Sequence, residues 1–177
     1  MRPVSSEQTI YREANEFCFE TARLRCRLLS AEDQALYRSL YSSETMMRYI
    51  MQPLTEAAAD QSFFYALRCI EQRPLQRLFL VVERKQDLVP LGIAGISSLN
   101  WQEYSVEYGI MLTKEGQDRG YALEVTKACL AHLIHSIGMN RVWVDIAEEN
   151  QAALKVARMA GLQAISENAR IHEYSVF

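Results

Sequence analysis

The sequence predicts an α+β fold, a mixed α/β architecture in which a central, twisted and mostly antiparallel sheet of about seven strands carries helices on both faces. Segments with strand or helix patterns follow one another in the order β-α-α-β-β-β-α-β-α-β-β. This order lacks the strict alternation of a doubly wound fold, and its many strands exclude a helical bundle. The composition, 49% apolar and 23% charged, is typical of a globular domain.

The first third of the chain contains one predicted strand and two predicted helices. The segment TARLRCRLLS at 21–30 alternates between apolar residues and arginine, which is the period of a strand. Ser30 then opens an S-x-x-D capping signal, which predicts a helix over residues 31–41. A second helix is expected after Pro53, with Thr55 as its N-cap.

Three strands are predicted in the middle of the chain. They are RLFLVVER at 77–84, LGIAGISSL at 91–99 and SVEYGIML at 105–112. Each is rich in apolar residues that favour strands. Polar segments at 87–90 and 100–104 separate them and predict turns.

Two helices and three short strands are predicted in the last third. Apolar residues that share one face predict a helix over 121–137, and Gly138 stands where a C-cap glycine belongs. A further helix over 150–160 closes at Gly161. The strands are RVWVDI at 141–146, LQAIS at 162–166 and HEYSVF at 172–177.

The chain of 177 residues is expected to form one domain over residues 17–177, with a tail or extension at residues 1–16. The net charge of −3 and the lack of a Lys/Arg cluster argue against a nucleic-acid or membrane partner. No apolar run approaches the roughly 20 residues of a membrane span. The polar N-terminus lacks the pattern of a secretory signal, so the cytoplasm is the expected compartment.

Cysteine and histidine give no sign of a metal site. The four cysteines are scattered without a C-x-x-C spacing, which favours buried or half-buried thiols at Cys18, Cys26, Cys69 and Cys129. His132 and His135 stand three residues apart on a predicted helix and could share a metal ion if a third ligand arrived. No supporting cluster is visible, so solvated histidines are the simpler interpretation.

The segment QDRGYALE at 117–124 connects a strand to the mouth of a helix. The N-terminus of a helix offers unpaired N–H groups and the positive end of the helix dipole, which together favour an anion. A glycine there lets the backbone approach a ligand closely. The segment matches neither the Walker loop nor the dinucleotide fingerprint. Taken alone, it is compatible with a plain turn and with a phosphate cradle.

The surroundings of this loop resemble the GNAT N-acetyltransferase superfamily. Gln117, Gly120 and Ala122 match its acyl-CoA signature, Q/R-x-x-G-x-G/A. VEYGIML resembles the strand before that signature, and NQAALKVARMAGL at 150–162 is similar to the superfamily's later helix motif. FETARLRCRLLSAEDQALYRSL and SETMMRYI resemble the branch that includes the ribosomal-protein N-terminal acetyltransferases. The resemblance runs from about residue 17 to the end and implies a GNAT-like fold.

The resemblance also implies acetyl-CoA as cosubstrate and no metal. Backbone amides of the loop would hold the CoA pyrophosphate, and these belong to Gln117, Asp118, Arg119, Gly120, Tyr121 and Ala122. The backbone of Met111, Leu112 and Thr113 would pair with the pantetheine arm like an added strand, and Asn150 would hydrogen-bond that arm. The side chain of Arg119 could add charge near the phosphates or be a solvated loop arginine.

Acetyl transfer to an amine needs a base, because only the neutral amine attacks. Glu107 is the expected base, since it falls where the superfamily often carries a glutamate, although it could instead be a solvent-facing strand residue. Glu103 is a weaker candidate. Tyr104, Tyr108 and Trp101 could line the acceptor pocket, with packing as the simpler interpretation.

The proton donor of the superfamily is missing. Its members usually place a serine or a tyrosine where this chain has Ala153 and Ala157. A thiolate with a reference pKa near 8.5 leaves without much help, so water can suffice. The resemblance therefore predicts an acetyl-CoA-dependent N-acetyltransferase that acts by direct transfer on a protein N-terminal amine or a small amine, as a monomer or homodimer. A non-catalytic acyl-CoA-binding protein of the same fold is the alternative.

Overall fold

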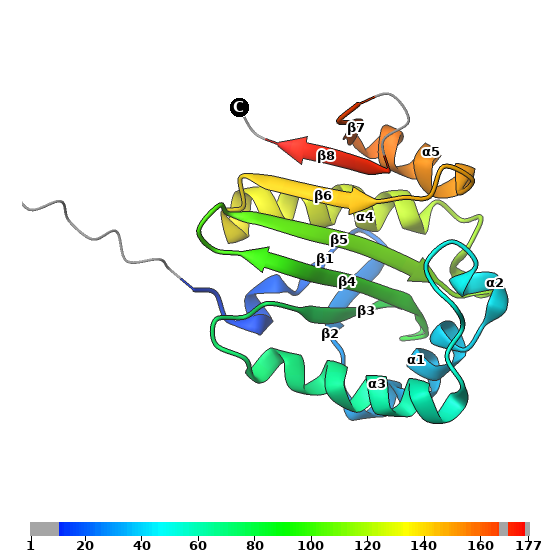
Figure 1. The fold of residues 1–177 in the computed structure, drawn as a ribbon. Coiled ribbons are helices and arrows are strands. Elements are labelled where there is room, and N and C mark those ends of the chain that lie inside the picture. Colours follow the sequence, from blue (N-terminus) through cyan, green and yellow to red (C-terminus); the bar gives the residue numbers. More distant parts are fainter. Residues whose placement is uncertain (1–10, 167–169, 176–177) are drawn as a thin grey trace, which may run out of the picture.

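A computed structural model describes residues 11–166 and 170–175, and its centre is one mixed β-sheet (Figure 1). The strands of the described part are β1 (Phe19–Glu20), β2 (Leu24–Leu28), β3 (Leu78–Arg84), β4 (Pro90–Asn100), β5 (Ser105–Leu112), β6 (Arg141–Asp145), β7 (Gln163–Ala164) and β8 (Ile171–Ser175). They lie in the order β1-β2-β3-β4-β5-β6-β8-β7. All neighbours are antiparallel except β5 and β6, which are parallel. The predicted fold class is confirmed. The additional strand β1 has two residues, too few for an alternating pattern.

Five α-helices accompany the sheet in the described part of the chain. They are α1 (Gln34–Tyr41), α2 (Glu44–Met47), α3 (Glu56–Arg68), α4 (Tyr121–His132) and α5 (Gln151–Ala160). The predicted N-cap of α3 is confirmed, because the Thr55 hydroxyl accepts a hydrogen bond from the Ala58 N–H at 3.2 Å. None of these helices is long and apolar enough to cross a membrane.

Two predicted helices have different boundaries in the structure. The helix expected over 31–41 starts as a 3-10 turn (Ala31–Asp33), with the capping box of Ser30 and Asp33 in place. The helix expected over 121–137 changes at its end into a π-helical turn (Leu133–Ile137), and Gly138 follows in the left-handed region at φ 90°. The four-residue α2 was not predicted, because one turn is too short to show a helical period.

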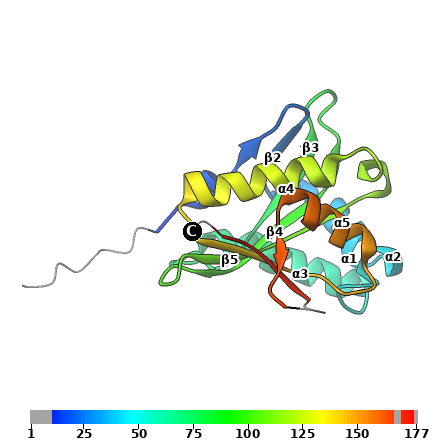
Figure 2. The same cartoon turned by 90° about the horizontal axis from the view of Figure 1, so that it is seen from above.

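The helices form a layer on each face of the sheet (Figures 1 and 2). α4 and α5 pack on the larger core, which includes Val125 and Val142, while α1 and α3 pack on a smaller cluster with Val81 and Ile93. The second layer is incomplete. In Figure 1, α1 and α3 lie over the β2–β4 side of the sheet, and the same face of β5, β6 and β8 is largely uncovered by the described helices.

The N-terminal part of the chain contributes to the larger core. Residues 1–10 of the predicted tail lie outside the described residues. A 3-10 turn (Ala14–Phe17) follows, and both of its end residues are buried. The packed part of the chain therefore begins before residue 17.

β5 and β6 separate along their length. Their pairing ends at Glu107 and Trp143, although β5 continues to Leu112 and β6 to Asp145. Beyond the Glu107–Trp143 pair, the edge of β5 that faces β6 has no neighbouring strand within the described residues. The split opens toward the N-terminus of α4, where the 117–120 loop lies.

Candidate active site

The loop between β5 and α4 has the backbone shape of a ligand cradle. Gly120 is the N-cap of α4 and adopts φ 76°, and Asp118 also has a positive φ of 56°. A Cβ added at Gly120 would meet nothing closer than the Arg23 Nη2 at 3.8 Å. Conformation rather than crowding therefore favours glycine here. The loop residues 117–120 are exposed, and the Gly120 N-cap has no side chain to accept from the first N–H groups of α4, which leaves these groups available to an anion.

Arg23 on the loop before β2 holds this cradle in place. Its Nη2 donates to the Arg119 carbonyl at 3.2 Å, and its guanidinium carbon lies 4.4 Å from the centre of the Tyr121 ring. Its Nε donates to the Glu124 carboxylate at 2.7 Å. Burial opposes the charge of Glu124, but hydrogen bonds from Thr21 and Arg23 outweigh it and lower its pKa. The loop is thus restrained from a distant segment, which no signal in the sequence showed.

The side chain of Gln117, the first residue of the acyl-CoA signature, makes hydrogen bonds within the protein. Its side-chain amide donates to the Leu112 carbonyl at 2.9 Å, which ties the start of the loop to the end of β5. The same nitrogen lies 3.6 Å from the Met46 sulfur. The signature glutamine therefore positions the loop through its side chain, while its backbone N–H donates to the Lys114 carbonyl at 3.4 Å.

The hydrogen-bond phase of β5 determines which residues face the split. The Thr113 N–H donates to the Leu91 carbonyl at 2.7 Å, on the β4 side. Backbone groups alternate between the two edges of a strand. The backbone N–H and C=O of Met111 therefore point toward β4 as well, whereas those of Ile110 and Leu112 point into the split. Of the three residues expected to pair with the pantetheine arm, Leu112 has the required direction.

Glu107 lies at the row where β5 and β6 separate. Its Oε2 accepts hydrogen bonds from the hydroxyls of Ser97 and Ser98, each at 3.0 Å. Ser98 has a positive φ of 52° at an irregularity in the β4–β5 ladder. These contacts fix the orientation of the half-buried carboxylate and leave Oε1 without a described protein donor. Such an arrangement suits a base that receives a proton at one oxygen.

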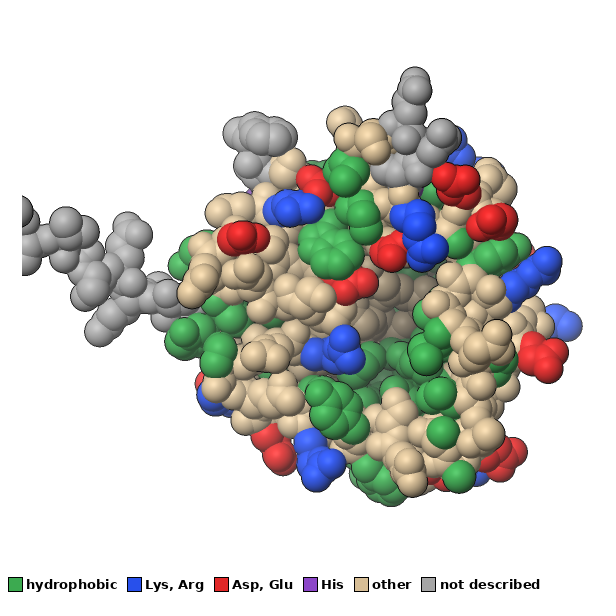
Figure 3. Space-filling model, in the orientation of Figure 1, with side chains coloured by type: hydrophobic (Ala, Val, Ile, Leu, Met, Phe, Trp, Pro, Cys, Tyr) green, Lys and Arg blue, Asp and Glu red, His purple; other side chains and the backbone are tan. Residues whose placement is uncertain are grey.

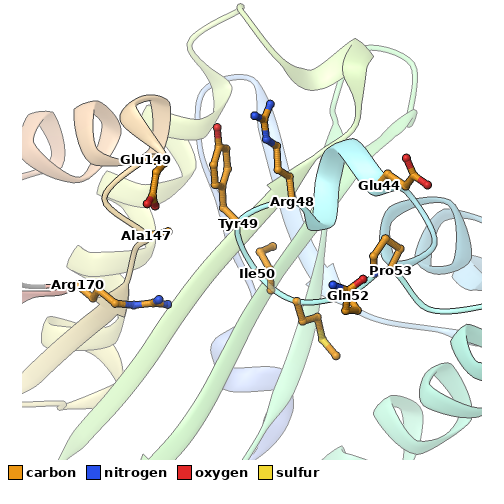
Figure 4. Close-up of a pocket in the computed structure, with 10 residues that line it drawn as sticks. Glu44, Arg48, Tyr49, Ile50, Gln52, Pro53, Ala147, Glu149 and Arg170 are labelled. Carbon is orange, nitrogen blue, oxygen red and sulfur yellow. The ribbon is translucent and has the colours of Figure 1, made fainter.

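A cavity of about 570 Å³ lies between the segment after α2 and the connection from β6 to α5 (Figure 4). In Figure 4, Tyr49 and Ile50 on one side face Glu149 and Arg170 on the other. Among the described residues that line it, Tyr49 carries the one hydroxyl. A second cavity of about 560 Å³ includes Ser98, one of the partners of Glu107. The second cavity is also lined by Trp101, one of the residues that the sequence suggested for an acceptor pocket, whereas the sequence suggested no lining residue of the first.

Several other candidate residues have structural roles. Tyr108 is buried, its hydroxyl lies 3.2 Å from the Thr126 hydroxyl, and burial raises its pKa well above the ordinary value. Trp101 is also buried, and its indole N–H donates to the Leu75 carbonyl at 2.7 Å. Glu103 is exposed in the turn. The packing interpretation therefore holds for Tyr108 and Trp101.

The histidines and cysteines likewise form no metal site in the described part of the chain. The Nε2 of His132 donates to the Glu16 carbonyl at 2.7 Å, and His135 is exposed. No group of three or more His, Cys, Asp or Glu that could hold a metal occurs among the residues described. The predicted state of the cysteines is confirmed, since Cys18 is half-buried and the other three are buried and free.

α5 presents no proton donor at the two expected positions. The Asn150 Oδ1 accepts the Ala153 N–H at 3.2 Å, so this residue caps the helix and keeps its amide nitrogen for another acceptor. Ala157 is buried against α4. Ala153 and Ala157 both pack against the larger core. Neither side chain can donate a proton to a leaving thiolate.

Comparison with known proteins gives one consistent result. A family model described as an acetyltransferase (GNAT) domain matches residues 23–163. Spermidine N(1)-acetyltransferase of Escherichia coli K12 is 22% identical over 153 residues, which cover 86% of this chain and 78% of that protein. An uncharacterized N-acetyltransferase, p20, of Bacillus licheniformis is 19% identical over 144 residues, 81% of this chain and 80% of that one.

Solved structures share the fold at similarly low identity. Spermidine N-acetyltransferase of Vibrio cholerae, in complex with CoA and spermine, aligns with a TM-score of 0.72 and 19% identity over 82% of this chain and 84% of that one. A candidate ribosomal-protein-serine acetyltransferase of Vibrio cholerae aligns with a TM-score of 0.71 and 16% identity over 92% and 99%.

Proposed function

Because the chain belongs to the GNAT acetyltransferase family, we propose that it moves the acetyl group of acetyl-CoA to a primary amine by direct attack in a ternary complex. The observation that carries this proposal is the split between β5 and β6, which has a carboxylate at its closed end and a helix N-terminus at its open end. An extended thioester can lie in such a split with its phosphates on the helix and its acetyl group beside Glu107.

The residues present fit acetyl-CoA. The pyrophosphate would be held by the backbone amides of Asp118, Arg119, Gly120, Tyr121 and Ala122, where the helix dipole favours an anion, whereas the Gln117 amide donates to the Lys114 carbonyl. Backbone groups of Leu112 and Ile110 would pair with the pantetheine arm in place of the missing strand. Asn150 has its side-chain nitrogen free for a carbonyl of that arm, because the cap uses only its oxygen.

Glu107 would perform the proton transfer. The acceptor arrives as an ammonium ion, and Oε1 of Glu107 takes its proton directly or through one water, which frees the nitrogen lone pair. The nitrogen then attacks the thioester carbon, and a backbone N–H facing the split stabilises the oxyanion. The C–S bond breaks as the nitrogen loses its second proton to solvent, which leaves a neutral amide, and CoA departs as a thiolate that solvent or a nearby hydroxyl protonates.

A small cationic amine is the acceptor class that the relatives favour. The names of the Escherichia coli and Vibrio cholerae relatives specify spermidine, and one structure contains spermine. A protein N-terminal amine is the other class to test. The alignment with the ribosomal-protein-serine acetyltransferase-like structure of Vibrio cholerae covers 99% of that chain. A carboxylate at the reacting position suits either cation.

Release of free CoA from acetyl-CoA, followed with a thiol reagent, tests the proposal. Spermidine and a set of short peptides with free N-termini serve as acceptors, and N-acetylated forms of the same compounds serve as controls. We expect release above the hydrolysis background with at least one free amine. Calorimetry in parallel measures CoA binding. Binding without release for any acceptor would contradict the transferase proposal and support the acyl-CoA-binding alternative.

A further inference from the structure

The uncovered face of the sheet carries an ordered row of side chains. The strand registers place Ser97, Glu107, Trp143 and Glu173 next to one another across β4, β5, β6 and β8. Register partners in neighbouring strands point to the same face. The alternate residues, such as Val142 and Val144, point into the core beneath α4 and α5. The row therefore lies on the face that the described helices leave largely uncovered, which Figure 3 shows as hollowed.

Trp143 is the member of this row that the proposed chemistry does not use. It lies directly beside Glu107, at the last paired position before β5 and β6 separate. It is half-buried, whereas the other tryptophan, Trp101, is buried and bonded within the core. A partly exposed indole beside the reacting centre can attract an organic cation to its ring face.

The charges around Trp143 favour the same kind of ligand. Glu173 lies on the side of Trp143 away from Glu107 and forms an ion pair with Arg141, so the net charge of this pair is close to zero. Glu107 is in no ion pair with a described cation, and its partners are two neutral hydroxyls. The row thus offers one negative charge and one aromatic face to a ligand, with no unpaired cation in it.

We propose that Trp143 binds a second ammonium group of the acceptor while Glu107 receives the proton of the reacting one. This inference rests on the proposed function and names its substrate class, a diamine or polyamine. Neighbouring strands lie about 4.8 Å apart. Three or four methylene groups between two nitrogens span roughly 5–6 Å at ordinary bond lengths. One ammonium can therefore reach Glu107 while the next lies over the indole.

Steady-state kinetics with 1,4-diaminobutane and n-butylamine test the selectivity. The two acceptors differ in the second amino group, so the ratio of their kcat/KM values isolates its contribution. We expect about tenfold preference for the diamine in the wild-type enzyme. Trp143→Leu should bring the ratio close to one, and Trp143→Phe should retain part of it. The KM for acetyl-CoA should stay the same in both variants.

Tryptophan fluorescence gives a readout that does not depend on turnover. In Trp101→Phe, the emission comes from Trp143, and titration with 1,4-diaminobutane should quench or shift it. In Trp143→Phe, the emission comes from the buried Trp101 and should not respond. The uncharged 1,4-butanediol should leave both variants unchanged. Circular dichroism checks that each variant is folded.

The outcomes separate this inference from the proposed function. Acetylation of peptides with no fluorescence response to the diamine would leave the transferase intact and overturn the role of Trp143. An equal kcat/KM for the two amines, or a preference unaffected by Trp143→Leu, would overturn it as well. A Trp143-dependent response without any acetyl transfer would support the cation site and contradict the transferase.

Discussion

Glu107 shows how the function depends on a single oriented carboxylate. Two serine hydroxyls hold one of its oxygens, and the other is free to accept a proton. Glu107→Gln keeps the shape and the hydrogen-bonding capacity but removes the basicity. We expect kcat to fall by about 100-fold or more, with the affinity for acetyl-CoA unchanged.

A matched variant distinguishes the base from general surface charge. Glu103→Gln removes a carboxylate from the adjacent exposed turn and should leave kcat within about twofold. The pH–rate profile adds a second readout, because the acid limb should disappear in Glu107→Gln if this carboxylate is the base. A retained acid limb would assign that role to another group.

Gly120 determines the cradle through its backbone conformation. A side chain with a negative charge at this position would lie where the pyrophosphate is expected. We expect Gly120→Glu to weaken CoA binding at least tenfold, as measured by calorimetry. Gly138→Glu is the matched control, since Gly138 has a similar φ of 90° and open space around it but lies at the far end of the helix. Equal CoA affinity in the two variants would mean that the 117–120 loop is a plain turn.

An ion-pair network joins β2, β3 and the turn before α1, at the opposite end of the strand order from β8. Arg27 of β2 donates two hydrogen bonds of 2.8 Å to Asp33 in the turn before α1, and another of 2.9 Å to Glu83 of β3. Both carboxylates are buried, each 4% exposed. Burial opposes ionisation of Asp33, but hydrogen bonds from Arg27 and Ser30 outweigh it and lower the pKa.

Loss of this network should destabilise the domain. Asp33→Asn leaves a partly buried guanidinium without its main partner, and we expect the free energy of unfolding to fall by about 3 kcal/mol. Since the folded pKa of Asp33 lies below its ordinary 3.8, its stabilisation is complete well above that pH and is lost as the pH falls from there through the lowered folded pKa. Urea unfolding at pH 7 and at a series of pH values down to about 2.5 measures both effects.

The control for that comparison is an exposed pair. Glu20→Gln breaks the Lys85–Glu20 ion pair, whose side chains are 36% and 59% exposed, and should have little effect on the free energy of unfolding. The difference between the two variants should shrink as the pH falls below 3.8. A difference that stays constant down to the lowest pH of the series would exclude ionised Asp33 as its source.

The sequence was sufficient for the elements with a long regular pattern. β3, β4, β5, α3 and α5 lie where apolar period and caps predicted them. The two-residue β1 and the four-residue α2 were missed because they are shorter than any period. The π-helical end of α4 keeps the apolar face of an α-helix, so periodicity could not distinguish it.

At the scale of the whole molecule, the unpredicted parts of the site depend on contacts distant in sequence. Arg23 donates a hydrogen bond to Arg119, which lies 96 residues later in the sequence. The alternating pattern of the strand indicated only that Arg23 is one of three arginines on its outward face. The row of Glu107 and Trp143 exists because β5 and β6 are parallel and then diverge. Strand register and splay follow from packing of the whole sheet, which local pattern does not encode.

Binding of acetyl-CoA should stabilise the entire domain, because the cradle in the second half of the chain is held by Arg23 from the first half. A ligand that binds only the folded state at 100 times its Kd adds about 2.7 kcal/mol. For a chain of this size, that corresponds to a rise in Tm of roughly 5–10 °C. The rise should grow with the logarithm of ligand concentration, which differential scanning fluorimetry can follow.

The same measurement distinguishes ligand linkage from nonspecific stabilisation. Gly120→Glu should lose most of the rise in Tm, whereas Gly138→Glu should retain it, although both variants carry a comparable backbone strain. Glu107→Gln should retain it too, since the carboxylate is assigned to the acceptor and not to CoA. A full rise in Gly120→Glu would place the CoA pyrophosphate away from the N-terminus of α4. A loss of the rise in Glu107→Gln would instead make this carboxylate part of the CoA site, because a group that acts only on the amine cannot change the linkage with acetyl-CoA alone.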